Sequence, residues 1–254
     1  MNIAGIAEFF DRVLDLNKFA ADPSNNGLQV CGNAQAECRK IAFAVDASLA
    51  SIEQAAANNA DMLVVHHGLS WGGEPRRWNG MTGKRFAALF ENHLALYAVH
   101  LPLDAHNVYG NNAVLCDLME LQQKQEFFAY HGMNIGWIGE RGKIGVEALA
   151  GKASLNRPYK LYPAPGGAQM VQKIAVVSGG GGMDGLEAAI AAGADVLVTG
   201  EFEHSMYHLV QESKTHVIAL GHYYSEVHGV QSLRKLIEKE FALPTVFLDI
   251  PTGL

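Results

Sequence analysis

The stretch from Ile41 to Gly68, IAFAVDASLASIEQAAANNADMLVVHHG, determines the fold because it holds a strand, a helix and a second strand in close succession. Its apolar start is typical of a buried strand. The alanine-rich segment Ser48–Ala60 predicts a helix, with its first residue as the N-cap. The run DMLVV predicts the next strand, which ends at His66 and His67. Short strands that alternate with helices indicate a parallel, layered α/β fold.

The same pattern occurs a second time further along the chain. From Ile174, IAVVSG predicts a strand, a glycine-rich turn and a helix follow, and DVLVTG predicts another strand. The second copy places Asp195 where the first has Asp61, and it places Gly200 and Glu201 where the first has its two histidines. An internal repeat of this length indicates two related α/β units.

Each copy continues to a third strand, which is followed by a histidine and, four residues later, by a carboxylate. HLALYAVHLPLD ends with His100 and Asp104, and THVIALGHYYSE ends with His222 and Glu226. In open α/β sheets, ligands bind at the carboxyl ends of the strands. Three strand ends of this sequence therefore carry side chains that can bind a metal ion.

The histidine pair predicts two metal ions. Adjacent residues on a strand point to opposite faces, so His66 and His67 would not share one ion if the strand continued. Gly68 allows the chain to turn, and each imidazole can then face a different ion. Imidazole and carboxylate ligands suit zinc, manganese, iron or nickel.

The two carboxylates are expected in different local structures. The residue before a proline disfavours the helical conformation, so LPLD after His100 is expected to be an extended loop that projects Asp104 inward. His100 would lie beside it as a ligand or as a support. SEVHGVQSLRKLIEKEF predicts a helix from near Ser225, with Glu226 in its first turn and His222 just before it. A carboxylate with spare oxygens can bridge two ions, whereas a histidine cannot.

Two further motifs have alternative interpretations. The glycine-rich loop Gly179–Gly182 resembles a phosphate cradle, but it matches no established nucleotide-binding motif, and a plain turn is the alternative. His204 and His208 follow Glu201 with i,i+4 spacing, and they are interpreted either as a minor metal motif or as solvent-facing side chains.

Composition restricts the class of protein. The chain has 254 residues, 49% of them hydrophobic, and a formal net charge of −7 without a basic cluster, which argues against a nucleic-acid binder. No apolar run approaches membrane-spanning length. The three cysteines lack metal-type spacing and are expected to be small buried residues, which fits a reducing, cytoplasmic setting.

Along the chain we expect a first α/β repeat at 1–125, connecting strands and loops at 126–170, and a second α/β repeat at 171–254.

Together these motifs resemble the NIF-three-like family, whose members are often named GTP cyclohydrolase I type 2 homologues. The resemblance covers essentially the whole chain and rests on SNNGLQVCG, VVHHG, YAVHLPLDAHNVYGNNA, the TGE turn and GHYYSE. It implies two intertwined α/β/α halves, assembled as a trimer of dimers into a hexameric ring. It also implies a dinuclear metal centre with five ligands and a nearby supporting histidine. The implied ligands are His66, His67, Asp104, His222 and Glu226, and the supporting residue is His100.

Two functions are consistent with such a centre. The first is a metal-dependent hydrolase, in which a water held by both ions attacks an anionic substrate such as a phosphate ester or a nucleotide-like molecule. The second is a non-catalytic metal-binding ring or scaffold, whose ions fix the junction of the two halves. Structural zinc sites are usually closed and four-coordinate, whereas five ligands for two ions leave open positions, which favours the hydrolase.

Overall fold

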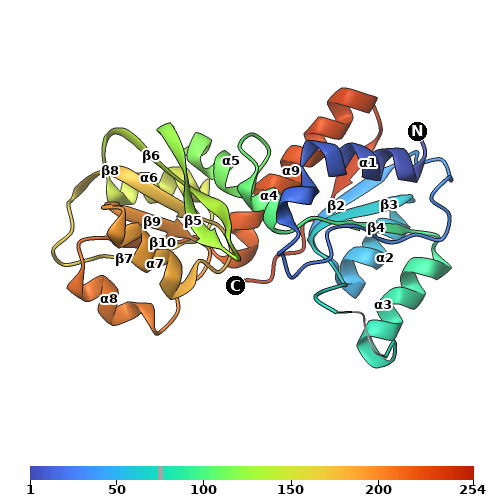
Figure 1. Cartoon of the computed structure of the whole chain (residues 1–254), viewed down its shortest axis with the longest axis horizontal. Helices are drawn as coiled ribbons and strands as arrows, with labels where there is room; N and C mark the ends of the chain where they lie inside the picture. The colour runs from blue at the N-terminus through green and yellow to red at the C-terminus, as the bar shows by residue number, and fades with distance from the viewer. Residues whose placement is uncertain (74–76) are drawn as a thin grey trace. The chain divides into compact units, whose positions relative to one another are not determined.

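The computed structural model describes residues 1–73 and 77–254 and has the predicted α/β class (Figure 1). It divides into two compact units, and each unit contains one copy of the repeat. Unit 1 consists of Met1–Leu103 and Gly229–Ile250, and unit 2 consists of Asp104–His228 and Pro251–Leu254. The expected segments 1–125, 126–170 and 171–254 follow the repeat along the sequence and stay a prediction.

Unit 1 is built on a five-stranded sheet in the order β1-β4-β3-β2-β11. The strands are β1 (Gly27–Val30), β2 (Ile41–Asp46), β3 (Met62–His67), β4 (Ala95–Ala98) and β11 (Thr245–Phe247). β11, β2, β3 and β4 are mutually parallel, and β1 is antiparallel to β4. Because Val65 pairs with Ala98, the carboxyl ends of β3 and β4 lie side by side.

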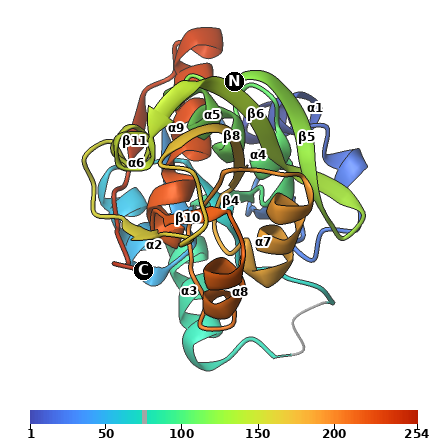
Figure 2. The same ribbon diagram turned by 90° about the vertical axis from the view of Figure 1, so that its left-hand side faces the viewer.

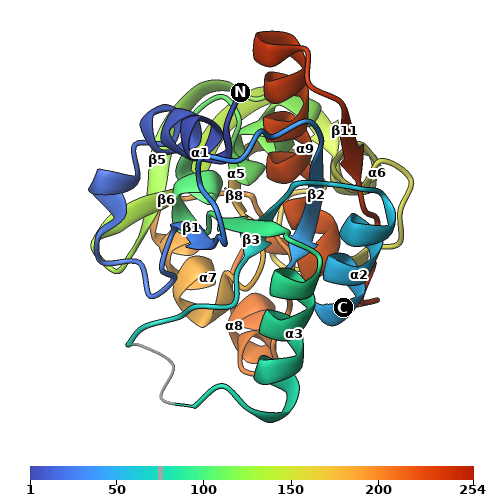
Figure 3. The same ribbon diagram turned by 90° about the vertical axis from the view of Figure 1, so that its right-hand side faces the viewer.

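Helices cover both faces of this sheet (Figure 3). They are α1 (Ile3–Val13), the short 3-10 helix η1 (Leu16–Phe19), α2 (Leu49–Ala57) and α3 (Gly80–Glu91). Ile52 of α2 and Leu89 of α3 belong to one core cluster with alternate residues of the strands. On the other face, Phe10 of α1 packs against Tyr97 with ring centroids 5.2 Å apart. The predicted N-cap is confirmed, since the Ser48 hydroxyl accepts from the backbone N–H of the third helical residue.

Unit 2 is built on a six-stranded sheet in the order β5-β6-β8-β9-β10-β7. The strands are β5 (Gln122–Tyr130), β6 (Met133–Gly145), β7 (Lys160–Tyr162), β8 (Met170–Val177), β9 (Val196–Thr199) and β10 (His216–Ala219). β8, β9 and β10 are parallel, as in the repeat of unit 1, while β6 and β7 add antiparallel strands to the two sides. The strands between the two repeats thus extend the second sheet.

Helices lie on both sides of the sheet of unit 2 (Figure 2), and successive strand residues face different helix pairs. The helices are α5 (Asn111–Leu118), α6 (Val146–Ser154), α7 (Gly182–Ala191) and α8 (Met206–Glu212). Val176 belongs to the cluster that contains residues of α5 and α6. Its neighbour Val177 belongs to the cluster that contains residues of α7 and α8. The alternation follows from the two-residue period of a strand and produces three layers, helix–sheet–helix.

Two helices differ from the sequence prediction. The segment after His100 was expected to be an extended loop, but α4 spans Leu101–Ala105. The prediction was wrong because Pro102 lies in the first turn, where a backbone N–H has no partner within the helix and proline is tolerated. The helix α9 spans His222–Phe241 and so begins three residues before Ser225, which makes His222 its first residue.

Among the residues that the structure describes, no helix is both long enough and apolar enough to cross a membrane.

Candidate metal centre

Three histidines of unit 1 converge at the carboxyl ends of β3 and β4. His66 and His67 are the last residues of β3, and His100 is the second residue after β4. The ring centroids of His66 and His67 lie 4.5 Å apart, and those of His66 and His100 lie 5.2 Å apart. One ring nitrogen from each of the three lies within 4.8 Å of the others, so the group can hold a metal ion.

Each of these imidazoles is oriented through its Nδ1 atom. Nδ1 of His66 lies 2.9 Å from the carbonyl oxygen of Val99. Nδ1 of His67 lies 2.8 Å from the Asp46 carboxylate. Asp46 is close because it ends the neighbouring strand β2 and pairs with His67 there. Because these oxygens accept the hydrogen bonds, Nδ1 carries a proton in both imidazoles, and in the neutral form of the ring the lone pair is then on Nε2. A hydrogen bond of this kind is the usual support of a metal-binding histidine.

The support of His100 comes from a carboxylate that the sequence analysis missed. Nδ1 of His100 lies 2.9 Å from Oδ1 of Asp22, whose Oδ2 also accepts from the backbone N–H of Leu101. Asn26 accepts the backbone N–H of His100. Burial alone would raise the pKa of Asp22, but the hydrogen bonds from His100, Asn26 and the Ser24 N–H outweigh it and lower that pKa. Asp22 stands two residues before SNNGLQVCG, one of the motifs that carry the family resemblance, and that motif is the signal that could have found it.

The turn after the histidine pair depends on Gly68 for space. A Cβ atom at this position would overlap the side chain of Gln29 and the Cβ of Ala98. Oε1 of Gln29 accepts from the backbone N–H groups of Leu69 and Ser70, at 2.8 and 3.1 Å. The chain therefore turns at Gly68, as predicted, and the side chain of Gln29 fills the space and holds the turn.

Unit 2 presents a second set of donors at the start of α9. Nε2 of His222 lies 3.2 Å from Oε1 of Glu226, one helical turn further on, and its Nδ1 lies 2.6 Å from Oε1 of Glu201. Glu226 is buried, with 3% of its surface exposed. Burial lowers the pKa of His222, but the hydrogen bonds and charges of Glu226 and Glu201 outweigh it and raise that pKa to about 9. Glu201 supports His222 as Asp46 supports His67.

Asp104, the first residue of unit 2, is held by two donors. Its Oδ1 accepts from Nδ2 of Asn111 and from the hydroxyl of Ser178, each at 2.9 Å. The side chain is buried, with 5% exposed. Asn112 fixes the same region, since its amide donates to the Asp104 carbonyl and its oxygen accepts the Ser178 N–H at 2.6 Å. A buried carboxylate that neutral donors orient in this way is suited to bind a cation.

The glycine-rich loop makes room for Glu226. A Cβ atom at Gly179 would overlap Oε1 of Glu226, and Gly179 has a φ of +62°, a conformation that side-chain residues rarely adopt. The N–H of Gly179 donates to the Ser225 hydroxyl at 2.9 Å, and the N–H of Gly181 donates to Thr199 at 3.3 Å. These N–H groups are therefore used within the fold, which favours the structural interpretation of the loop over a phosphate cradle.

Comparison of the two copies shows where the repeat diverges. Because Met62 and Val196 are matching first residues of β3 and β9, His67 corresponds to Glu201. The distance from the third strand to the next histidine differs by one residue between the copies. His100 is the second residue after β4, and His222 is the third residue after β10. Unit 1 thus supplies a cluster of imidazoles, whereas unit 2 uses one imidazole and carboxylates.

The other histidines have different surroundings. His216 is buried, its Nδ1 accepts the Ala164 N–H, and its Nε2 donates to the Ala168 carbonyl. Nδ1 of His106 accepts the Val108 N–H. His204 and His208 are exposed, and within the described ranges they belong to no group of metal-competent side chains. The solvent-facing interpretation of the His204–His208 pair is therefore favoured.

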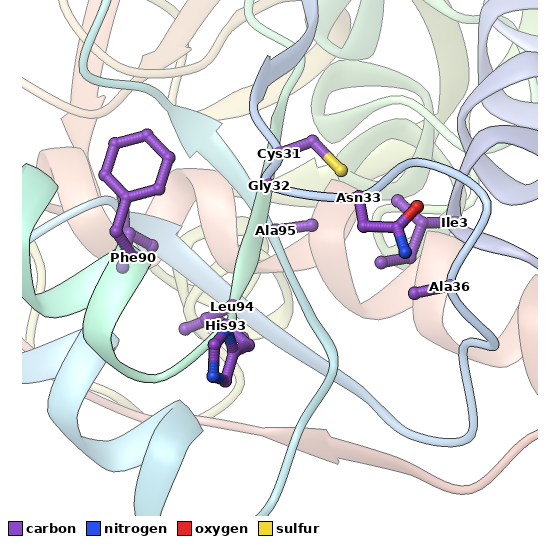
Figure 4. Close-up of a pocket in the computed structure, with 10 residues that line it drawn as sticks. Ile3, Cys31, Gly32, Asn33, Ala36, Phe90, His93, Leu94 and Ala95 are labelled. Carbon is purple, nitrogen blue, oxygen red and sulfur yellow. The ribbon is translucent and has the colours of Figure 1, made fainter.

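The cysteines lie apart from these donors. Burial raises the pKa of Cys38 and of Cys116 to about 12, so both thiols are protonated, as expected of small buried residues. Cys31 is only partly buried and lines a cavity of about 450 Å³ in unit 1. Figure 4 shows it on one side of this cavity with Asn33, while Phe90 and His93 come from the end of α3 and the residues after it.

The donor set fits divalent first-row metals. The Nδ1 atoms of four imidazoles, those of His66, His67, His100 and His222, each face a carbonyl or a carboxylate oxygen, so each of them carries a proton. Two buried carboxylates complete the set, and Gly179 leaves the space that one of them needs. Mixed imidazole and carboxylate donors are typical of zinc, manganese, iron and nickel sites.

Comparison with known proteins identifies relatives over the whole chain. The family model described as Duf34/NIF3 (NGG1p interacting factor 3) matches residues 1–252. A protein of Archaeoglobus fulgidus named GTP cyclohydrolase 1 type 2 homolog is 45% identical over 257 residues, covering 100% of both chains. A protein of the same name from Pyrococcus horikoshii is 44% identical, covering 98% of each.

Solved structures show the same fold. The crystal structure of TTHA1606 from Thermus thermophilus has 36% sequence identity to this chain, covers 100% of both chains and has a TM-score of 0.88.

Proposed function

The chain belongs to the Duf34/NIF3 family, and from this premise and its donor set we propose that it is a dinuclear metal-binding protein that hydrolyses a small anionic substrate. The observation that carries the proposal is the common orientation of four imidazoles through Nδ1. A histidine in an ordinary core makes whichever hydrogen bonds its surroundings allow, as His216 does by accepting at Nδ1 and donating from Nε2. Four with the proton on the same nitrogen are expected of a metal site.

We assign five ligands to two ions: His66, His67, Asp104, His222 and Glu226. His100 is assigned as a support or an additional ligand. The chain itself connects the two donor sets, because α4 begins directly after His100 and carries Asp104. Metal identity is proposed only as a class, namely zinc, manganese, iron or nickel.

The proposed chemistry follows from charge. Divalent ions held by these residues would supply Lewis acidity for the attack of water. The carboxylates of Asp104 and Glu226 balance only part of the metal charge, so the centre retains a net attraction for an anion. Asp46, Asp22 and Glu201 keep the imidazoles in the required tautomer. The relatives are named GTP cyclohydrolase 1 type 2 homologs, which supports a phosphate ester or nucleotide-like substrate.

The test is a screen of metal-reconstituted protein against phosphate monoesters, phosphodiesters and nucleotides, with metal content measured in each sample. We expect turnover of one class by the wild type and its loss in Glu226→Gln, which keeps the size of the side chain but removes its charge. A protein that holds two ions and turns over none of these classes would favour the non-catalytic metal-binding ring or scaffold.

We also propose that the protein works as a cytoplasmic homo-oligomer, a hexameric ring as the family resemblance implies. Large apolar side chains on and near α3 support self-association, since Trp78, Met81 and Phe90 are 58%, 65% and 47% exposed. All three lie on α3 or two residues before it, and exposed apolar patches often mark an interface.

A further inference from the structure

A cavity in unit 2 lies at the carboxyl ends of β9 and β10, where ligands bind in α/β sheets. Its volume is about 510 Å³, which suits a small molecule. Gly200 and Glu201 border it after β9, and Leu220 and Gly221 border it after β10. The cavity shares Glu201 with the donor set but contains none of the five assigned metal ligands.

Aromatic side chains form much of the cavity wall. They are Tyr159, Tyr162, Phe202 and Tyr224. The rings of Tyr162 and Phe202 are stacked, with centroids 3.6 Å apart and an interplanar angle of 9°. The hydroxyl of Tyr159 donates to the Glu147 carboxylate at 2.9 Å, which fixes that ring. Stacked and anchored rings provide a preorganised surface for a planar ligand.

Two cationic side chains accompany these rings. Lys160, at the start of β7, lines the cavity and is exposed. The guanidinium carbon of Arg157 lies 5.0 Å from the centroid of the Tyr224 ring. The acidic side chain in the lining is Glu201, whose Oε1 is hydrogen-bonded to Nδ1 of His222. The cavity therefore has aromatic walls and two charged side chains, Lys160 and Glu201, of which Glu201 is engaged by His222 and Lys160 can meet an anionic group.

We propose that this cavity is a second ligand site, which binds a small anion with a planar aromatic ring. The ring lies against the Tyr162–Phe202 wall, and the anionic group pairs with Lys160. Because Glu201 borders the cavity and positions His222, the bound ligand contacts the carboxylate that supports one proposed metal ligand. This site goes beyond the proposed hydrolysis, since its binding needs no turnover.

The experiment measures binding by isothermal titration calorimetry on the metal-loaded protein. The probe is adenosine 5′-monophosphate, and ribose 5-phosphate is the matched probe without a ring. We expect the first to bind about tenfold more tightly, because only its base can stack on the aromatic side chains. Equal affinity for both probes, or no binding of adenosine 5′-monophosphate, would overturn the proposal.

Three variants locate the site. Lys160→Glu should weaken binding of adenosine 5′-monophosphate about tenfold through loss of a charge-assisted contact. Lys214→Glu makes the same charge change at an exposed residue of unit 2 outside the lining and should leave the affinity unchanged. Phe202→Leu should weaken adenosine 5′-monophosphate but not ribose 5-phosphate. Lys160 is exposed, so its variant tests the site even if Phe202→Leu fails to fold.

Metal content measured in the same samples separates this inference from the proposed function. We expect all three variants to retain the metal content of the wild type. Binding that is insensitive to Lys160→Glu and Phe202→Leu but is lost in Glu226→Gln would place the probe at the metal ligands and overturn the second site. Absence of turnover with intact, Lys160-dependent binding would contradict the hydrolase alone.

Discussion

Asp61 and Asp195 hold the same position in the two units and make the same contacts. Oδ2 of Asp61 accepts the backbone N–H groups of Arg39 and Lys40, at 2.8 and 3.1 Å. Oδ2 of Asp195 accepts those of Gln172 and Lys173, at 2.8 and 2.9 Å. In both units the lysine also donates from Nζ to a backbone carbonyl at the end of the helix that follows. Lys40 donates to Asn58 at 2.8 Å, and Lys173 donates to Ala192 at 2.7 Å. The repeat thus preserves a hydrogen-bonded junction between strand and helix, which fixes where the next strand begins.

This junction predicts an acid-dependent contribution to stability. Burial alone would raise the pKa of Asp61, but its hydrogen bonds with Arg39 and Lys40 and the Arg39 charge lower it below the ordinary 3.8. A lowered pKa stabilises the folded protein above the ordinary value, and this contribution is lost as the pH falls through the folded-state pKa. We expect Asp61→Asn to lower stability by about 1–2 kcal/mol at pH 7, because it weakens charge-assisted hydrogen bonds.

Thermal unfolding of both proteins at several pH values checks this prediction. The midpoint for Asp61→Asn should be lower by roughly 2–8 °C at pH 7, and the difference should shrink below the ordinary pKa of the carboxyl. Glu53→Gln, at an exposed position of α2, is a control for the loss of a carboxylate. A difference that grows on acidification would contradict the assigned direction of the pKa.

A second prediction concerns Gly179, where a side chain would meet Glu226. Gly179→Ala places a Cβ against Oε1 of Glu226 and forces alanine into a φ of +62°. The backbone conformation alone costs about 1 kcal/mol. We expect reduced metal content by mass spectrometry of the reconstituted protein, because the carboxylate must move.

The next residue provides the matched control. A Cβ at Gly180 would have its nearest neighbour, Oε2 of Glu201, at 3.6 Å, which is an ordinary contact. Gly180→Ala should therefore retain its metal. Equal metal content in the two alanine variants would show that the space at Gly179 is not needed for the centre.

Much of the fold and of the donor set could be predicted because the relevant signals are local. The strands of the repeat are short apolar runs, and His66, His67 and His222 stand at their ends or within three residues after them. The supporting residues could not be predicted in this way. Asp22 and His100 are 78 positions apart in the sequence, and Ser178 and Asp104 are 74 apart. Such pairs follow from the packing of strands and loops rather than from a spacing.

The error at α4 has a different origin. A proline disfavours helix at the residue before it, but it is accepted in a first helical turn, which is where Pro102 lies. The helix start is also bonded from elsewhere, since Asp22 accepts the N–H of Leu101 and Asn26 accepts that of His100. These side chains, distant in sequence, decide the local structure.

A third prediction concerns assembly. We expect a closed homo-oligomer, with six chains as the family resemblance implies, because soluble assemblies usually close symmetrically. Light scattering of metal-loaded protein at micromolar concentration should give about six times the mass of one chain. Met81→Lys places a charge on the exposed surface of α3 and should reduce the mass if α3 is part of the interface. A monomeric mass for the wild type would rule the assembly out.

The last prediction separates a catalytic centre from a purely structural one through His67. This side chain is partly exposed, and its contacts with Asp46 and the neighbouring imidazoles lie at the end of β3. The apolar core of unit 1 does not depend on it, so His67→Ala should fold. A catalytic centre predicts that metal content and turnover of the anionic ester fall together, while thermal stability changes by only about 1 kcal/mol. A structural centre predicts instead that loss of metal lowers the unfolding temperature or dissociates the oligomer, with no turnover in any sample.

His208→Ala removes an exposed histidine from α8 and serves as the control for His67→Ala. Turnover that persists unchanged in a metal-depleted His67→Ala sample would defeat the hydrolase proposal.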